Sequence, residues 1–324
     1  MRRRVGITGA GLVSPVADSP AVLVEAMASG RSGTRLMPFD PARDLGGRNT
    51  RPLDRLSQLV AAATARALID AACDADYRAA HGVGLALGTV FSSVGTICAF
   101  DRRAIEVGPQ YVSPLDFANT VLNAAAGQAA IWHGLRGANA TIAAGGASGL
   151  QAIAYAADLI ASGAIDAMVA GGADERSPEA LAAIADAGLG DASGGTPLGE
   201  AAAMVVLEAE ETARARGAQI RAMILGQASG MAHIPGASVD ASLTARVARA
   251  ALDEAGVRDV DARITAGAVF AIVGDTLGAT GALQIVAGLE TLRAQAHVRT
   301  VLVETTTADG HGCAIVMGAP PGAS

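Results

Sequence analysis

Short apolar runs alternate along the chain with longer stretches in which apolar residues recur every three or four positions. A short apolar run bounded by glycine is typical of a buried strand, and the longer spacing predicts an amphipathic helix. We predict strands at 5–8, 81–89, 167–170, 202–208, 300–304 and 313–317, and helices at 53–70, 149–162, 210–216, 243–255 and 281–295. The glycine-rich residues 9–15 follow the first strand and are predicted to form a turn. The alternation indicates an α/β protein.

The strand and helix blocks recur in a similar order in two parts of the chain. We expect an N-terminal half over residues 1–215 and a shortened C-terminal half over residues 216–324. No segment rich in proline, serine or charge separates them, so the halves are expected to pack as one body. No repeat of high identity connects them, and internal duplication therefore stays a hypothesis at this point.

Composition narrows the chemistry that is open to the protein. Of the 324 residues, 51% are hydrophobic, which is enough for a large core. All 24 basic residues are arginines because the sequence contains no lysine, so an amine nucleophile or a lysine Schiff base is excluded. The net charge of −7 argues against binding along a nucleic-acid backbone.

Cysteine usage and the N-terminus give the expected compartment. Cys73, Cys98 and Cys313 are widely spaced without a CxxC pair, so we expect neither a metal site nor a disulfide framework. The basic start at 1–4 runs into residues 5–9 without a long apolar stretch, so no secretion signal is predicted. No run of ~18 apolar residues predicts a membrane span. A cytoplasmic protein without contact to membranes is expected.

Several segments, in a specific order and spacing, resemble the β-ketoacyl synthases of fatty-acid and polyketide assembly. The resemblance implies a thiolase-like fold, in which two similar α/β halves form a layered α-β-α-β-α body. The segments that carry it are Arg3–Pro15, Leu53–Leu59, Val112–Pro114, Asn123–Gly127, Gly134–Asn139, Val169–Ala173, Gly199–Glu208 and Ala213–Gly217.

The nucleophile position of that family is degenerate in this chain. The family uses a cysteine on a sharp turn at a helix N-terminus, where backbone N–H groups lower the pKa of the thiol. The corresponding turn spans residues 144–151, and the cysteine position falls on Gly146, which cannot hold an acyl group. Ser148 is a substitute nucleophile only if a base lies beside it, and a small residue in the first turn of a helix is more simply a cap.

The positions that would activate the extender unit are degenerate as well. The family has a Lys-x-x-x-Gly-His segment, which resembles residues 270–282; here Phe270 takes the lysine position and Asp275 the histidine position. A carboxylate would repel a developing enolate unless it were protonated. A second motif, His-Gly-Thr-Gly-Thr, has no counterpart, since only residues 262–269 occupy its place.

The remaining histidines offer little replacement. His81, His133 and His297 are expected to be structural or exposed, and His233 resembles a loop that is not catalytic. His311 lies in residues 309–312, which resemble the glycine-rich closing loop of the family, and is the one for which ligand contact is considered.

A catalytically inactive subunit would explain why the catalytic positions are degenerate while the surrounding segments still resemble the family. The chain resembles the chain-length factors of type II polyketide synthases, which pair with an active ketosynthase; its shorter length and Gly146 favour the polyene branch. The resemblance implies a heterodimer and no cofactor of its own. The acyl chain arrives on a phosphopantetheinyl acyl carrier protein, which docks mainly through the partner.

A chain-length role requires an apolar wall that closes a tunnel. The expected wall residues are Phe91, Ile97, Phe100, Phe117 and Leu122; the alternative is that they belong to an ordinary core. Two other functions stay open. One is a divergent acyltransferase or hydrolase that uses Ser148, Asp275 or His311, and the other is a non-catalytic scaffold for docking the carrier protein.

Overall fold

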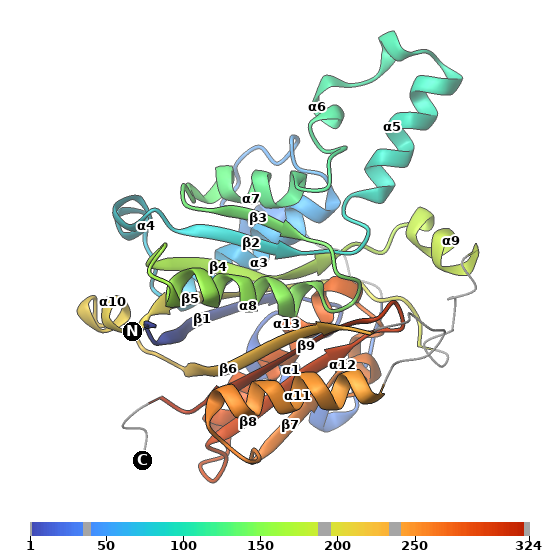
Figure 1. The fold of residues 1–324 in the computed structure, drawn as a ribbon. Coiled ribbons are helices and arrows are strands. Elements are labelled where there is room, and N and C mark those ends of the chain that lie inside the picture. The colour runs from blue at the N-terminus through green and yellow to red at the C-terminus, as the bar shows by residue number, and fades with distance from the viewer. Residues whose placement is uncertain (1, 35–39, 187–195, 233–240, 321–324) are drawn as a thin grey trace.

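The computed structural model describes residues 2–34, 40–186, 196–232 and 241–320 of the chain. The strands of these residues form one mixed sheet in the order β3-β2-β4-β5-β1-β6-β9-β8-β7 (Figure 1). Their bounds are β1 Val5–Val13, β2 Gly84–Gly88, β3 Asn139–Ile142, β4 Ala167–Asp174, β5 Ala201–Ala209, β6 Ala222–Met231, β7 Ala262–Thr265, β8 Thr300–Thr306 and β9 His311–Gly318.

Helices cover both outer faces of the sheet and fill the space between its two halves. Their bounds are α1 Pro20–Ser29, α2 Pro41–Asp44, α3 Arg55–Asp70, α4 Ala75–His81, α5 Val94–Glu106, α6 Pro114–Phe117, α7 Ala124–His133, α8 Ser148–Ala161, α9 Pro178–Asp186, α10 Glu210–Ala215, α11 Ala241–Ala255, α12 Ala266–Val273 and α13 Thr280–Ala294, with short 3₁₀ turns η1 Pro109–Tyr111 and η2 Leu277–Ala279. α3 packs on β1, β4 and β5, and α11 packs on β6, β8 and β9. α8 and α13 contact each other and strands of both halves. The resulting order is α-β-α-β-α, as the family resemblance implied.

The two halves of the sheet repeat one topology. In the N-terminal half β2 runs parallel to β4, β4 antiparallel to β5, and β5 antiparallel to β1. In the C-terminal half β7, β8, β9 and β6 follow with the same relative directions. The halves meet where β1 pairs antiparallel with β6, and this pairing is symmetric about Gly6 and Met223. Only β3 has no counterpart among the described strands, because β7 is the outermost strand of the C-terminal half.

An irregularity of the backbone is repeated too. β1 has a bulge at Thr8, where its pairing with β5 shifts between Ile7 and Gly9. β6 has one at Leu225, where its pairing with β9 shifts between Ile224 and Gly226. A bulge inserts one extra residue and bends the strand, and recurrence at equivalent positions marks it as a feature of the fold.

The predicted turn at residues 9–15 is wrong, because β1 continues to Val13. Gly9 and Gly11 are extended strand residues that allow α3 to approach closely. A Cβ on Gly9 would lie 2.5 Å from the Ala67 carbonyl oxygen, and one on Gly11 would lie 2.4 Å from the Ala63 carbonyl oxygen. The C-terminal half uses Gly226 in the same way, since a Cβ there would lie 2.3 Å from the Ala251 carbonyl oxygen of α11. These glycines serve helix packing rather than a turn.

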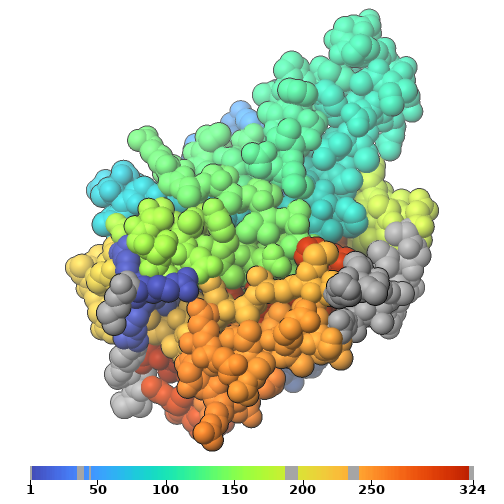
Figure 2. Space-filling view, in the orientation of Figure 1, coloured from blue at the N-terminus to red at the C-terminus, as the bar shows by residue number. Residues whose placement is uncertain are grey.

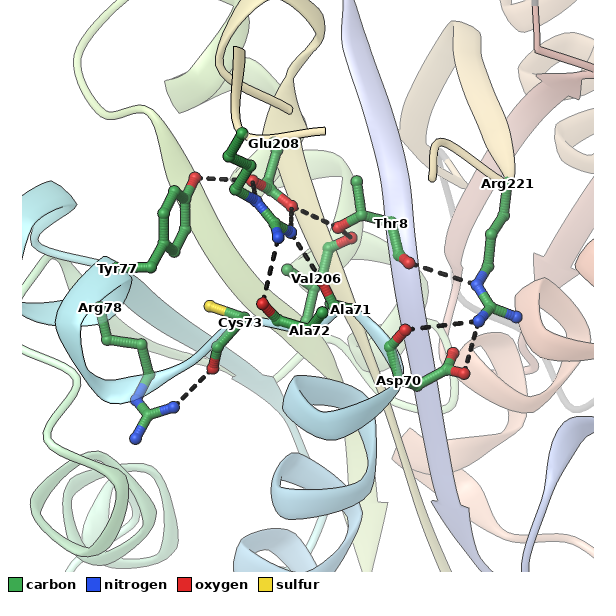
Figure 3. A network of polar contacts seen from close by, with 11 residues as sticks. Thr8, Asp70, Ala71, Ala72, Cys73, Tyr77, Arg78, Val206, Glu208 and Arg221 are labelled. Atoms are coloured by element: carbon green, nitrogen blue, oxygen red, sulfur yellow. Dashed lines mark hydrogen bonds and ion pairs between the residues drawn. The ribbon is translucent and has the colours of Figure 1, made fainter. Parts of the chain in front are cut away.

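A buried ionic network ties the start of β1 and the C-terminal end of β5 to α3 and α4 (Figure 3). Glu208 is fully buried and accepts hydrogen bonds from Tyr77 Oη at 2.6 Å, from Thr8 Oγ1, and from two nitrogens of Arg216. Arg216 also donates to the Ala71 carbonyl at 2.8 Å, where α3 ends. Burial opposes ionisation of Glu208, but the guanidinium of Arg216 and the hydroxyl donors outweigh it and hold the pKa of the carboxyl below its usual value.

Two further boundaries bear on the sequence predictions. The strand expected at 81–89 begins only at Gly84, since His81 is the last residue of α4. The expected division at residue 215 falls between α10 and β6. In the described chain no single helix has the length and apolar character needed to cross a membrane; α3 and α4 satisfy the criterion only as a pair bent by 97°.

Candidate functional site

The turn before α8 keeps its sharp backbone although it has no nucleophile. Gly145 has a φ of 54°, a left-handed conformation that favours glycine, and the amides of Ala147 and Ser148 bond back to the carbonyls of Ala144 and Gly145. Gly146 stands two residues before α8 and is half-buried. A Cβ at Gly146 would lie 3.0 Å from Thr307 Cγ2 and 3.9 Å from the Leu277 carbonyl oxygen. A side chain at this position would therefore point toward two loops of the C-terminal half.

Ser148 is locked into the turn. Its hydroxyl is fully buried, donates to the Gly145 carbonyl at 2.5 Å and accepts from the Ala144 amide at 2.8 Å. A serine nucleophile requires a base that takes its hydroxyl proton, but here a backbone oxygen holds that proton. Ser148 holds the backbone of the turn but does not cap α8, so the prediction that it is a cap is wrong; Ala147 is the N-cap residue, and no side chain caps the helix there.

Two loops of the C-terminal half close over this turn. The first contains Asp275 and Leu277, and the second contains Thr307 and Asp309. The Asp309 carboxylate lies directly against Gly145, since a Cβ built there would overlap its Oδ2 atom. Sequence reasoning placed Asp309 only within a glycine-rich motif and missed this contact. Two carboxylates therefore lie in the loops that face the turn.

Asp275 stands where the resemblance places a histidine. Its Oδ1 atom accepts from the Leu277 amide at 2.9 Å, and its backbone pairs with Pro197 and Gly199. Burial raises the pKa of the Asp275 carboxyl, although the Leu277 amide acts in the opposite direction. Phe270, at the lysine position, is a half-buried residue of α12, and this helix follows β7 directly at Ala266. No room for the missing histidine motif separates β7 from α12.

The histidines do not supply a base to the turn through any described contact. His81 stacks on Tyr77, and His133 contacts the Ala61 carbonyl at 2.8 Å. His297 is exposed, and His311 begins β9 opposite Met231. His233 lies outside the described residues.

The cysteines do not provide an activated nucleophile either. Burial raises the pKa of Cys73 to about 11 and that of Cys313 to about 12, so neither thiol is activated. Cys98 is a half-buried residue of α5, and all three cysteines are free. Among the described residues no group of three or more His, Cys, Asp or Glu side chains is arranged to hold a metal ion.

Residues 94–122 form an arm that projects from the body (Figures 1 and 2). None of the residues of α5, its first helix, is buried. Most of the exposed large hydrophobic side chains of the described residues belong to this arm: Ile105, Val107, Tyr111, Leu115, Phe117, Val121 and Leu122. Exposed apolar side chains concentrated in one segment make this arm a candidate interaction site.

The expected wall residues lie in this arm and at its base. Phe91 follows β2, Ile97 and Phe100 belong to α5, and the rings of Phe100 and Phe117 are 5.8 Å apart. Phe117 is 63% exposed and Leu122 is 46% exposed. The alternative that the five are ordinary core residues is wrong, because none of them is buried.

A buried carboxylate at the base of the arm was missed by sequence reasoning. Asp174 is the last residue of β4, is fully buried, and accepts hydrogen bonds from the Phe91 amide at 3.0 Å and the Gly278 amide at 2.9 Å. The available signal was an acidic pair, Asp174 and Glu175, directly after an apolar strand. Glu175 accepts from the Gly95 amide at 3.1 Å, near the start of α5.

Comparison with known proteins agrees with this geometry. Residues 39–213 match the model of the β-ketoacyl synthase N-terminal domain family. A 3-oxoacyl-[acyl-carrier-protein] synthase 2 of Vibrio cholerae is 33% identical over 295 residues, an alignment that covers 79% of this chain and 70% of that protein.

Solved structures share the fold. A structure described as the ishigamide ketosynthase/chain length factor superposes with a TM-score of 0.88 at 23% identity, over 99% of this chain and 100% of that chain. A type II polyketide synthase acyl-carrier protein in complex with its ketosynthase, bound to the hexaketide, gives a TM-score of 0.83 at 20% identity over the same shares. At these identities the likeness shows the fold alone, which is thiolase-like as expected.

Proposed function

The chain belongs to the β-ketoacyl synthase family, and from this premise we propose that it is a catalytically inactive subunit that pairs with an active ketosynthase and helps to set the length of the acyl chain. The acyl chain would be delivered on the phosphopantetheinyl arm of an acyl carrier protein, which docks mainly through the partner. The subunit needs no cofactor of its own for this role.

The observation that carries the proposal is the turn at Gly146. The backbone makes a sharp turn, yet the position of the nucleophile has no side chain, and the hydroxyl of Ser148 in the same turn is bonded to the backbone. Condensation also needs donors that stabilise an enolate, and here Asp275 and Asp309 supply carboxylates instead. A family fold without the catalytic side chains supports a role in binding the acyl chain or in shaping its tunnel.

A partner subunit is supported by two exposed features. The arm presents apolar side chains that include Ile105, which is 84% exposed. β3 is the outermost strand of the N-terminal half, and an unpaired strand edge readily accepts a strand from another chain. Interfaces that persist are large and apolar, so a second ketosynthase-like chain that covers both features fits the surface. A structure named for both a ketosynthase and a chain length factor is among the solved proteins with this fold.

Control of chain length is supported by the position of the apolar arm. Phe91, Phe100 and Phe117 are bulky side chains that a partner would cover, together with Ile97 and Leu122. Apolar side chains at the boundary between two chains close a tunnel at a depth that depends on their volume. The expected product length therefore depends on the size of these residues.

The test has two steps. The tagged chain is purified gently from its native cell, and its companions are identified by native mass spectrometry; an equimolar chain with an intact Cys-His-His ketosynthase site is expected. The purified pair is then assayed with Phe91→Ala and Phe100→Ala, which are expected to lengthen the product, while Ile69→Ala, on the exposed surface of α3, serves as the control. Recovery of a stable homodimer without a ketosynthase contradicts the proposal.

The other two functions give different results in the same assays. A docking scaffold leaves the product length unchanged in both phenylalanine variants. A hydrolase or acyltransferase gives turnover by the isolated chain that Ser148→Ala abolishes. We expect no turnover by the isolated wild type, because Ser148 contacts no described base.

A further inference from the structure

Asp174 gathers hydrogen bonds from two loops that are far apart in the sequence. Its Oδ1 atom accepts from Thr89 Oγ1 at 2.8 Å and from the Phe91 amide at 3.0 Å. Its Oδ2 atom accepts from the Val90 amide at 2.9 Å and from the Gly278 amide at 2.9 Å. The first loop leads into the arm, and the second belongs to the degenerate site of the C-terminal half. One fully buried carboxylate therefore joins the base of the arm to the vacant site.

The contact continues into the arm through Thr89 and Ser92. Thr89 Oγ1, which donates to Asp174, accepts from the Ser92 amide at 3.0 Å. Ser92 Oγ in turn donates to the Leu122 carbonyl at 3.0 Å. Ser92 has a φ of 52°, which is unfavourable for a residue other than glycine and persists only where surrounding contacts impose it. The hydrogen bonds of Thr89 and Leu122 impose it here.

These contacts connect two of the residues expected to line the tunnel. Phe91 is held through its own amide, and Leu122 through its carbonyl, on one continuous path from Asp174. We infer that Asp174 is a positioning residue that sets where Phe91 and Leu122 lie relative to the loop of Gly278, and that it thereby determines the chain length that the pair accepts. The inference rests on the proposed function, since it names the residue that orients the proposed tunnel wall.

A carboxylate is suited to this position because it only accepts hydrogen bonds, and the Thr89 hydroxyl and the amides of Val90, Phe91 and Gly278 all donate to it. Burial raises the pKa of Asp174 to about 6, while the donors from Phe91, Thr89, Val90 and Gly278 act in the opposite direction. Near neutral pH the group is therefore ionised and binds its donors as charge-assisted hydrogen bonds, which are stronger than neutral ones. Asparagine would replace one of the two acceptor oxygens with an NH₂ donor. The backbone N–H groups that bond to that oxygen in the wild type would then lose their acceptor.

The test compares Asp174→Asn with a matched control in the purified pair. Asp261 is the control, since its Oδ2 atom also accepts from two amides and a hydroxyl, those of Arg299 and Thr300, but at the start of β7. Asp174→Asn is expected to broaden the distribution of product lengths, and Asp261→Asn to leave it unchanged. In the isolated chain, amide exchange at Val90, Phe91 and Gly278 is expected to be about tenfold faster in Asp174→Asn.

A second variant covers the case in which Asp174→Asn does not fold. Thr89→Val removes the link between Asp174 and Ser92 and leaves the carboxylate in place. It is expected to raise the rate of amide exchange at Ser92 and, like Asp174→Asn, to broaden the distribution of product lengths. A purely structural role of Asp174 would lower stability in both variants without moving the length distribution of the assembled pair, and this result would overturn the inference.

Failure of the inference and failure of the proposed function are separable. If Phe91→Ala does not change the product, the proposed function is wrong whatever Asp174 does. If Phe91→Ala changes the product but neither Asp174→Asn nor Thr89→Val does, the tunnel wall is real and Asp174 does not position it.

Discussion

The bulges of β1 and β6 are equivalent in backbone but opposite in chemistry. In the N-terminal half the bulge residue is Thr8, and its hydroxyl donates to the buried Glu208. In the C-terminal half the bulge residue is Leu225, whose side chain covers Gly318, so that a Cβ on Gly318 would lie 2.5 Å from it. One half closes this end of the sheet with an ionic network, and the other closes it with apolar packing. The same backbone therefore tolerates either chemistry, provided that each is complete.

The opposite ends of the equivalent strands β4 and β8 differ as well. Glu208 pairs with Ala167 at the start of β4, and Gly318 pairs with Thr300 at the start of β8. Counting from these pairs, Asp174 and Glu175 correspond to Thr307 and Ala308. The N-terminal half thus has two buried carboxyl groups where the C-terminal half has none. Ionic chemistry at both ends of its sheet should make the N-terminal half the part that responds most to charge removal and to pH.

The strongest test of this contrast removes the cation of the N-terminal network. Arg216→Ala leaves Glu208 as a buried charge without its ion pair, and such a loss costs about 3–5 kcal/mol. The free energy of unfolding, measured with urea, is expected to fall by this amount. The counterpart in the C-terminal half, Leu225→Ala, is expected to cost less, about 2–3 kcal/mol, because it removes apolar contact only. Equal losses would contradict the contrast.

The pH dependence of stability is the next test. Burial first, and then the charges of Asp54, Glu200 and Asp174, raise the pKa of Glu175 to about 7 against the effect of the Gly95 amide. The folded chain therefore retains a proton that the unfolded chain releases above about pH 4.5, so this contribution to stability is lost as the pH rises to about 7.

Glu175→Gln removes this dependence. Through Glu175, the free energy of unfolding of the wild type is expected to fall by on the order of 3 kcal/mol between about pH 4.5 and 7. The variant is expected to lack this decrease. Chemical denaturation at a series of pH values measures the difference, with the exposed Glu106→Gln as the control. Parallel pH profiles for wild type and Glu175→Gln would show that Glu175 is not the titrating group.

The prediction with the smallest effect tests whether α3 and α11 pack on their strands in the same way. Gly9→Ala and Gly226→Ala each place a methyl group against a helix carbonyl, at 2.5 Å and 2.3 Å. Both are expected to destabilise by about 1–3 kcal/mol, the usual cost of overpacking, and by similar amounts. Thermal unfolding measures the two losses, and tolerance of one substitution but not of the other would mean that α3 and α11 are not packed equivalently.

The fold was predictable where local pattern and family resemblance agreed. The helix expected at 53–70 became α3, Arg55–Asp70, because apolar residues recur at helical spacing and Asp54 caps its start through the Ser57 amide. The prediction failed at residues 9–15 because glycine occurs both in turns and in strands against which a helix packs closely, and the sequence does not distinguish the two. Gly9 and Gly11 are required by the closeness of α3, which is a tertiary contact that local pattern cannot reveal.

The sequence located the residues of the candidate site but did not predict their contacts, and the roles that the family resemblance gives them stay predictions. Gly146, Phe270 and Asp275 are identified by alignment of motifs, and the structure places them on the turn before α8, on α12 and in the loop that follows it. The exposure of Phe117 was not predictable, since an apolar residue of a core and one of an interface have the same composition. Asp174 was missed because a hydrogen-bond acceptor that joins residues 89–91 to residue 278 depends on contacts across the whole chain.

The apolar arm places a demand on the cell that makes the protein. Because α5 has no buried residue, the isolated chain exposes apolar side chains of the kind that drive aggregation and attract chaperones. In the proposed pair a companion chain would cover them, and its supply would limit the amount of usable subunit. Balanced synthesis of the two chains would then be part of the physical stability of the assembly.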